Sequence, residues 1–225
     1  MKLPQILSFK IVPGLLLAMT FTGKAATNYF ISPTFRAGEG SQSAYWEIFT
    51  SAYGGANIPD GIAFGGLSLA NATITQSVDP GAFLTGTGNI YDYAAPTGFT
   101  LNEIATFNIG QVFFQTRTTA GSSPLDYNSV SLTYDLGAGP TTLTGNHTLL
   151  TDAEGGDSLL WTWDLSGTPG VSSFSINFNA SDASMSFDSA MLDIEAVPEP
   201  SVIALFLLGG FGLLTIRRFR QQLSL

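Results

Sequence analysis

Short stretches in which hydrophobic and polar residues alternate run through the middle of the chain. The clearest lie at residues 130–136, 159–165 and 174–178. Side chains along a strand point to opposite faces in turn, so each stretch predicts a strand with one buried face. Further stretches of this kind lie at residues 45–50, 62–69, 72–78, 103–109, 111–118 and 185–194. Between the two ends of the chain no stretch of ten residues has helical spacing, and the pattern predicts an all-β domain.

Turn-forming residues separate these stretches. Examples are Pro59-Asp60-Gly61, Asp79-Pro80-Gly81 and Thr168-Pro169-Gly170. Proline fixes φ and glycine reaches positive φ at no steric cost, so both residues favour turns. Many short strands without helices between them predict an antiparallel β-sandwich, and we expect one of the jelly-roll type.

The last stretch changes its alternation partway along. Its hydrophobic residues are at odd positions first and at even positions afterwards: Met185, Phe187, then Ala190, Leu192 and Ile194. A β-bulge near residues 188–189 reconciles the two halves, as does a strand buried on both faces. Residues 186–194 also resemble the closing strand of jelly-roll carbohydrate-binding modules, which implies a sugar-binding domain.

The first 25 residues have the pattern of a secretory signal peptide. Lys2 and Lys10 provide positive charge, and a short apolar run follows at residues 11–19. This run is too short to span a bilayer of about 30 Å. Gly23 and Ala25 are small residues at positions −3 and −1 for cleavage after Ala25, as signal peptidase requires. We expect a signal helix at residues 1–25 that directs export.

An uncharged apolar segment lies near the C-terminus. Residues 201–216 carry no charge, and Arg217, Arg218 and Arg220 follow directly. As a helix the segment would be about 24 Å long, slightly short for a bilayer. The positive-inside rule keeps the arginines in the cytoplasm and the preceding residues outside. The signal peptide predicts the same orientation, so we expect a transmembrane helix at residues 201–216.

A Pro-Glu-Pro motif, formed by Pro198, Glu199 and Pro200, precedes this helix. The motif, the glycine-containing helix and the arginine cluster follow one another in the order of the PEP-CTERM sorting tail of Gram-negative bacteria, which residues 197–222 resemble. The resemblance implies that an exosortase in the membrane recognises and cleaves the tail. It also implies delivery to the cell surface or to an extracellular matrix of exopolysaccharide, often in a biofilm. It does not extend to residues 26–196.

Other surface anchors fit the tail less well. A glycolipid-anchor signal ends in an apolar segment without terminal arginines. A Gram-positive sortase signal has the motif Leu-Pro-x-Thr-Gly, which the chain lacks. A permanent membrane anchor that is never cleaved is the remaining alternative.

Charge is distributed unevenly between the middle and the ends. Residues 26–196 contain two basic residues, Arg36 and Arg117, against sixteen acidic ones, for a net charge of −14. Affinity for nucleic acid comes mainly from Lys and Arg contacts to phosphate, so we expect no nucleic-acid partner. The chain has no cysteine, which excludes disulfides and thiolate metal sites.

Two aromatic pairs are candidate contacts for a glycan. They are Tyr45 with Trp46, and Tyr91 with Tyr93 in a region rich in Gly, Asn and Pro. Packing at the rim of the core is the alternative for both pairs.

A third aromatic pair, Trp161 and Trp163, lies on one face of a predicted strand. Leu159 and Leu165 share that face, so we expect this pair in the core rather than on a sugar-binding surface.

A loop with three carboxylates is a candidate calcium site. Asp152, Glu154 and Asp157 surround two glycines between predicted strands, and calcium prefers several oxygen ligands from a flexible loop. A solvated hairpin turn is the alternative.

No catalytic motif stands out in the chain. His147 is the single histidine, whereas an imidazole metal site needs more than one. No serine has the surroundings of a nucleophile elbow. We therefore expect a non-enzymatic structural or adhesive protein of the cell surface or matrix. A carbohydrate-binding module is the first alternative, and a polysaccharide-degrading enzyme with two facing carboxylates is the second.

Overall fold

The computed structural model describes residues 30–36, 38, 40–62, 67–69, 71–151 and 157–197. The expected signal helix and transmembrane helix lie outside these residues, as do Pro198, Glu199, Pro200, Arg217, Arg218 and Arg220. In the described part of the chain, no helix has both the length and the apolar character needed to span a membrane.

The described residues form strands and one short 3-10 helix, η2 (Tyr127–Ser129). Over the first half of the chain the strands are β1 (Ser41–Trp46), β2 (Ala56–Asn57), β3 (Leu67–Ser68), β4 (Thr73–Gln76), β5 (Phe83–Leu84), β6 (Ile90–Tyr91) and β7 (Gly98–Ile104). They continue with β8 (Ile109–Thr118), β9 (Ser131–Asp135), β10 (Pro140–Thr144), β11 (Asn146–Thr151), β12 (Asp157–Asp164), β13 (Ser173–Asn179) and β14 (Ser186–Ala196).

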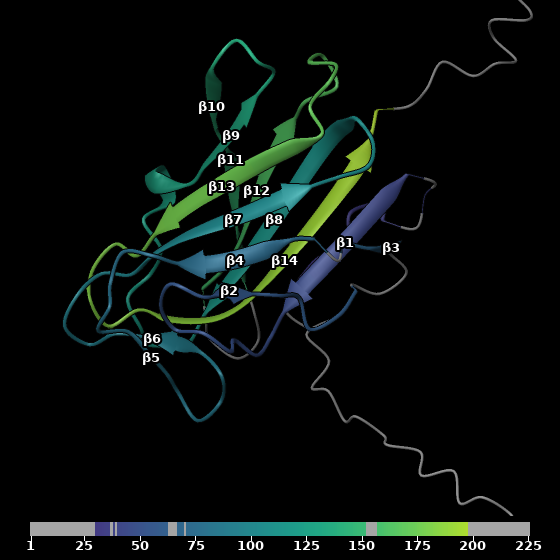
Figure 1. Ribbon diagram of the computed structural model, residues 1–225. Helices are drawn as coiled ribbons and strands as arrows, with labels where there is room; N and C mark the ends of the chain where they lie inside the picture. The colour runs from purple at the N-terminus through teal and green to yellow at the C-terminus, as the bar shows by residue number, and fades with distance from the viewer. Residues whose placement is uncertain are drawn as a thin grey trace, which may run out of the picture.

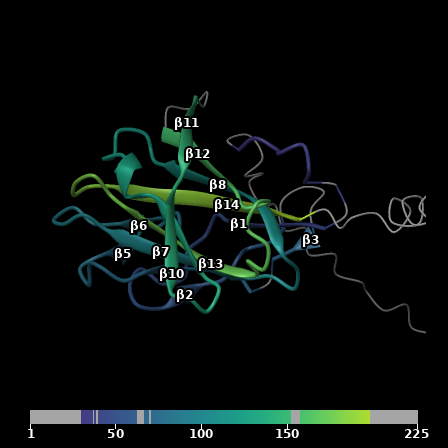
Figure 2. The same cartoon turned by 90° about the horizontal axis from the view of Figure 1, so that it is seen from above.

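These strands form two sheets (Figure 1). Sheet A has the order β11-β12-β8-β14-β1-β3, and the β5–β6 hairpin joins it through the pairing of β6 with β14. Sheet B has the order β10-β9-β13-β7-β4-β2. Within the described strands the pairing is antiparallel, apart from the short parallel contact of β1 with β3. Viewed from above, β8 and β14 lie in one layer and β7 and β13 in the other (Figure 2).

The core lies between the two sheets. Phe114 of β8 in sheet A and Phe178 of β13 in sheet B have ring centroids 5.1 Å apart. Phe178 also stacks on Phe99 of β7 at 5.0 Å. Burial of each such side chain stabilises the fold by about 2–3 kcal/mol. Two antiparallel sheets that share one apolar core confirm the predicted all-β sandwich.

Both features that were predicted as alternatives for the last strand are present, since β14 has a bulge and is buried on both faces. The pairing of β14 with β8 shifts register between Phe187 and Ser189. The extra residue moves the alternation by one position. Phe187 therefore points to the core with Ala190, Leu192 and Ile194, and all four are buried.

Some predicted strand limits are wrong. The stretch at residues 103–109 combines the end of β7 with the turn before β8, because β7 ends at Ile104. The β5–β6 hairpin and strands β10 and β11 were not predicted. Two-residue strands are too short to show alternation, and β10 is largely exposed on both faces, which removes the hydrophobic signal.

An N-terminal strap, which we define as residues 30–36, crosses the outer face of sheet A. The Ile31 N–H donates to Gln115 Oε1 at 2.9 Å, and Gln115 Nε2 donates to the Ile31 carbonyl at 2.9 Å. Arg36 donates two hydrogen bonds to Asp193 of β14, from Nε to Oδ1 at 2.6 Å and from Nη2 to Oδ2 at 2.7 Å. Both side chains are buried, so the strap closes over a salt bridge shielded from water.

Candidate functional site

A hollow of about 360 Å³ opens at the end of the sandwich that carries the β5–β6 hairpin. It lies where β6, the turn after β8 and the start of β14 meet, because Tyr91 of β6 pairs with Ser186 of β14. Its lining consists of small, hydroxyl and aromatic residues: Thr85, Tyr91, Thr119, Ala120, Gly121, Ser122, Ser184 and Ser186. Hydroxyl groups both donate and accept hydrogen bonds, so the surface suits a ligand rich in hydroxyls.

An aromatic pair, with Phe83 exposed and Tyr91 half-buried, stands beside the hollow. Phe83 of β5 and Tyr91 of β6 are direct cross-strand partners, and their rings meet edge to face at 5.5 Å. Phe83 is 43% exposed. Such pairs are worth about 0.5–1.5 kcal/mol beyond burial, which holds the tyrosine ring in place at the rim of the hollow.

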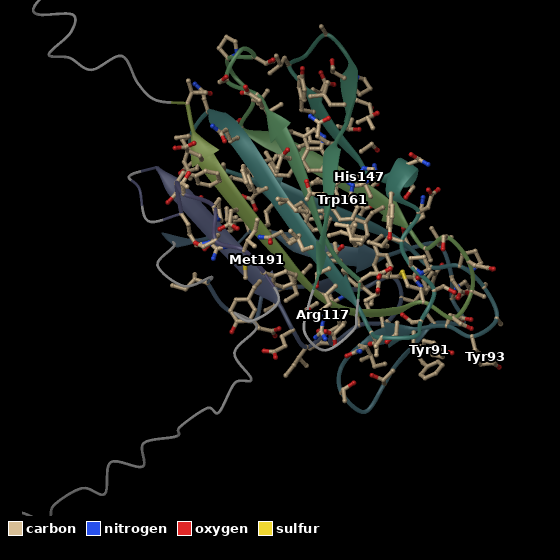
Figure 3. All side chains as sticks on the ribbon, turned by 180° about the vertical axis from the view of Figure 1, so that it is seen from behind. Tyr91, Tyr93, Arg117, His147, Trp161 and Met191 are labelled. Atoms are coloured by element: carbon tan, nitrogen blue, oxygen red, sulfur yellow. The ribbon has the colours of Figure 1, made fainter. Side chains whose placement is uncertain are left out.

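Tyr93 extends the aromatic surface outward. It is 71% exposed, and Figure 3 shows it close to Tyr91 at the edge of the molecule, far from His147. Of the aromatic residues predicted as glycan contacts, Tyr91 and Tyr93 therefore lie at the hollow's end of the molecule, and Tyr91 lines the hollow itself.

A buried amide connects the two walls of the hollow. Asn89 Nδ2 donates to Thr119 Oγ1 at 2.9 Å and to Ser186 Oγ at 3.2 Å. The two hydroxyl oxygens are themselves 2.9 Å apart. Asn89 is only 6% exposed. Three hydrogen-bond contacts to a buried amide leave the network little freedom to rearrange, so the two hydroxyls keep fixed positions in the wall.

Two carboxylates lie next to this end of the hairpin. Asp92 follows Tyr91 and is buried, and its Oδ1 accepts from the backbone N–H of Ala94 and, at 2.9 Å, from that of Ala95. Asp79 Oδ1 accepts from the Gly81 N–H at 2.9 Å. Asp79 Oδ2 is buried and has no hydrogen-bond partner among the described residues.

The pKa values of these two carboxyls shift in opposite directions. The Ala94 N–H, the Asp79 carboxyl and the Ala95 N–H lower the pKa of Asp92. The Gly81 N–H lowers the pKa of Asp79, but burial and the neighbouring Asp92 carboxylate outweigh it, so this pKa is raised.

The two residues of the other aromatic pair predicted as a glycan contact are buried to different degrees. Trp46 is fully buried, and its Nε1 donates to the Asn57 carbonyl at 3.0 Å. Tyr45 is half-buried and packs with Phe30 and Met191 under the N-terminal strap. Neighbouring residues of β1 point to opposite faces, one into the core and one under the strap. Trp46 therefore lies in the core, whereas Tyr45 is half-buried, as Tyr91 is.

The core assignment of Trp161 and Trp163 is confirmed. They are 0% and 4% exposed, and Leu159 and Leu165 on the same face are fully buried. This removes them as a platform for a sugar ring.

The predicted calcium loop lies mostly outside the described residues. Asp152 and Glu154 are not described, whereas Asp157 begins β12 and lies 3.5 Å from Tyr127 Oη. In residues 30–36, 38, 40–62, 67–69, 71–151 and 157–197, no group of three or more His, Cys, Asp or Glu side chains comes together. His147 is exposed on β11, with its ring centroid 5.5 Å from that of Tyr127.

The sequence reading missed Glu103, a buried glutamate in sheet B. It is 2% exposed and its Oε2 has no hydrogen-bond partner among the described residues. Burial raises the pKa of Glu103 to about 7, although the Ile104 N–H acts in the opposite direction. Phe99, Leu101 and Glu103 follow one another at a spacing of two, and this alternation carried the signal that the carboxyl faces inward.

No family model and no curated protein matches the chain. One solved structure to which the chain is similar is the enzymatically active domain of tailspike protein 4 of bacteriophage CBA120. The TM-score is 0.26 at 12% identity, over 75% of this chain and 21% of that one. The chain thus spans about a fifth of that protein's length. An overlap this small carries no conclusion about fold or activity.

Proposed function

We propose that residues 26–196 are a non-enzymatic domain that holds extracellular polysaccharide at the surface of the cell or in its matrix. The observation that supports this most directly is the aromatic pair of exposed Phe83 and half-buried Tyr91 beside a hollow lined by hydroxyl groups. A pyranose ring has an apolar face of C–H groups and a rim of hydroxyls. An aromatic ring suits the former, and fixed hydroxyl partners suit the latter.

Binding is favoured over catalysis by the chemistry of the lining. Glycoside hydrolysis ordinarily requires two carboxyl groups on either side of the scissile bond. The lining residues of the hollow include no carboxyl and no imidazole. The hydroxyl and aromatic groups of the lining support the binding role.

Delivery to the cell surface forms the second part of the proposal. It rests on the signal peptide at residues 1–25 and on the sorting tail at residues 197–222, with Pro198, Glu199 and Pro200 as the motif that an exosortase recognises. Replacement of these three residues by alanine should leave the tail uncleaved and the chain in the membrane fraction. Unchanged release would contradict the sorting role.

We also propose that the two sheets form a jelly roll, in which the β5–β6 hairpin and the loop after β8 form one end of the sandwich. Binding at such an end leaves the outer faces of both sheets free of the ligand.

Binding is tested with the full chain in a detergent that has no sugar head group. Affinity electrophoresis through gels that contain polysaccharide measures retardation of the wild type and of Tyr91→Ala. We expect the substitution to weaken binding about tenfold or more, since stacking and part of the wall are lost. Tyr53→Ala is the matched control, because Tyr53 is 47% exposed and does not line the hollow. Equal retardation of all three proteins would contradict the proposed site.

A further inference from the structure

The hydrogen bonds around Asn89 fix which of its side-chain atoms faces the hollow. Thr87 Oγ1 donates to Asn89 Oδ1 at 3.2 Å. Thr85 Oγ1 lies 3.0 Å from Thr87 Oγ1. Because a threonine hydroxyl has one proton and that of Thr87 is already used, Thr85 is the donor to Thr87. Asn89 Oδ1 thus accepts from Thr87 in the β5–β6 turn, and Asn89 Nδ2 donates to Thr119 and Ser186.

One hydroxyl proton is left over in this network. Thr119 Oγ1 and Ser186 Oγ both accept from Asn89 Nδ2, and one of them donates to the other. Two hydroxyls carry two protons, and a single contact between them uses one. The second proton has no acceptor among the described residues. The wall therefore presents a hydrogen-bond donor at a position that the buried amide determines.

Ser184 lines the hollow in a strained backbone conformation. Its φ is +67°, and it is the one non-glycine residue with positive φ among the described residues. Its N–H donates to the Asp92 carbonyl at 2.7 Å, and its carbonyl accepts from the Ser123 N–H at 3.1 Å. Positive φ costs a residue with a Cβ about 1 kcal/mol that glycine does not incur.

The strain at Ser184 points to a role for its side chain. Strained residues cluster at binding sites, where the surrounding structure holds a particular group in place. The Ser184 hydroxyl has no hydrogen-bond partner within the described part of the chain. It is therefore a second donor in the lining that is left for a ligand.

The charge around the hollow excludes one class of glycan. The two basic residues of the exported domain are both in salt bridges, Arg36 with Asp193 and Arg117 with Asp188. Residues 26–196 carry a net charge of −14. A uronic acid would meet this net negative charge, with no unpaired guanidinium to compensate.

We propose that the hollow selects a neutral sugar unit of an uncharged polysaccharide, with Ser184 and the Thr119–Ser186 pair as the two donors to its oxygens. This inference rests on the proposed function and gives its ligand class. The sugar ring stacks on Tyr91 in the open hollow of about 360 Å³. Ser184 is thus a specificity-determining residue.

The ligand class is tested by affinity electrophoresis of the full chain in gels that contain dextran or galactomannan, which are neutral, or alginate, which is a polyuronate. Each gel is run once with EDTA and once with calcium. We expect retardation by at least one neutral polymer in both buffers and no retardation by alginate. Binding to alginate alone, or to alginate only with calcium, would overturn the inference and leave polysaccharide binding in place. Retardation by none of the polymers would overturn both.

The role of Ser184 is tested by Ser184→Gly, with oligosaccharides of the polymer that binds. Glycine accepts the positive φ, so we expect an unchanged melting temperature or a rise of about 1–3 °C. The dissociation constant measured by calorimetry should increase about fivefold to tenfold, the usual effect of one lost hydrogen bond. Unchanged affinity in this stable variant would overturn the assignment.

Two further variants separate the donor pair from other surface hydroxyls. Thr119→Val combined with Ser186→Ala removes both hydroxyls of the pair, since either hydroxyl alone would keep a free proton, so binding should weaken by a similar factor. Ser181→Ala is the matched control, because the exposed Ser181 hydroxyl donates to the Pro124 carbonyl at 2.9 Å and does not line the hollow. We expect its affinity to stay within about twofold of the wild type. A larger loss in Ser181→Ala than in the double variant would contradict the proton count.

Discussion

Each sheet contains a buried carboxyl group, and only one of the two has a cationic partner. Asp193 of sheet A lies under the N-terminal strap with Arg36, whereas Glu103 of sheet B points inward and its Oε2 has no partner among the described residues. Burial raises the pKa of Asp193, and the hydrogen bonds and charge of Arg36 offset only part of that rise. Burial raises the pKa of Glu103 to about 7. Burial thus raises both pKa values, and the Arg36 guanidinium limits the rise at Asp193.

The largest effect is expected when the partner of Asp193 is removed. Arg36→Met keeps a long side chain in place but leaves the Asp193 carboxylate buried without compensation. Such losses cost about 3–5 kcal/mol. Urea denaturation at pH 7 should show this decrease in the free energy of unfolding, and the difference from the wild type should shrink as the pH falls and Asp193 is protonated.

A double variant separates the lost attraction from the stranded charge. Arg36→Met with Asp193→Leu should recover much of the stability, since replacement of both partners by apolar groups is often close to neutral. If the double variant were as unstable as Arg36→Met alone, loss of packing under the strap would explain the result, and the role of the salt bridge would be wrong.

A smaller effect is expected from Glu103, and it depends on pH. The folded protein keeps the Glu103 proton up to about pH 7, whereas the unfolded chain releases it near its ordinary pKa of about 4.3. Stability is therefore lost as the pH rises through this window, by up to about 3 kcal/mol. Glu103→Gln should remove this loss, so that the variant exceeds the wild type in stability at pH 8 and approaches it at pH 4.

Asp164 provides a control with the opposite slope. The hydroxyl and the N–H of Ser166 lower the pKa of Asp164, so its contribution to stability is present above its unfolded pKa and is lost as the pH falls. Asp164→Asn should therefore be slightly less stable than the wild type at pH 7 and equal to it in acid. A Glu103→Gln curve parallel to that of the wild type would contradict the buried-carboxyl account.

The smallest effect is expected from the Asp79–Asp92 pair. Asp79→Asn supplies an N–H₂ donor to Asp92 and removes the like charge. We expect a small rise in melting temperature at pH 7 with EDTA present. If the melting temperature of Asp79→Asn were below that of the wild type with calcium but not with EDTA, the two carboxylates of the wild type would instead share a cation.

The core of the sandwich could be predicted from the sequence, but the end formed by the β5–β6 hairpin could not. Trp161 and the bulge before Ser189 were predictable because long strands between two sheets repeat their pattern over many residues. The β5–β6 hairpin has two-residue strands, and only β5 exposes both of its side chains, so its fold depends on pairing with β14, which is far away in the chain. Trp46 shows the same limit, since a single aromatic residue at the end of a strand does not reveal which face is covered.

The candidate site was predictable only through Tyr91 and Tyr93. Its donors come from three segments distant in sequence, around Asn89, Thr119 and Ser184, and nothing local links them. The positive φ of Ser184 is equally hidden, because serine has no preference for that conformation. Tertiary contacts alone bring these groups to one wall.

The position of β14 in sheet A has a consequence for the order of folding. This strand is the last one described, and it lies between β8 and β1, where it also supplies Asp193 to the strap. A chain that emerges from its N-terminus first cannot complete sheet A, or fasten residues 30–36 against it, until residues 186–196 are available. The domain thus stays open until almost its whole length has been made. If the chain is exported as we propose, this delay keeps it unfolded enough to pass through a translocation channel until the apolar tail reaches the membrane.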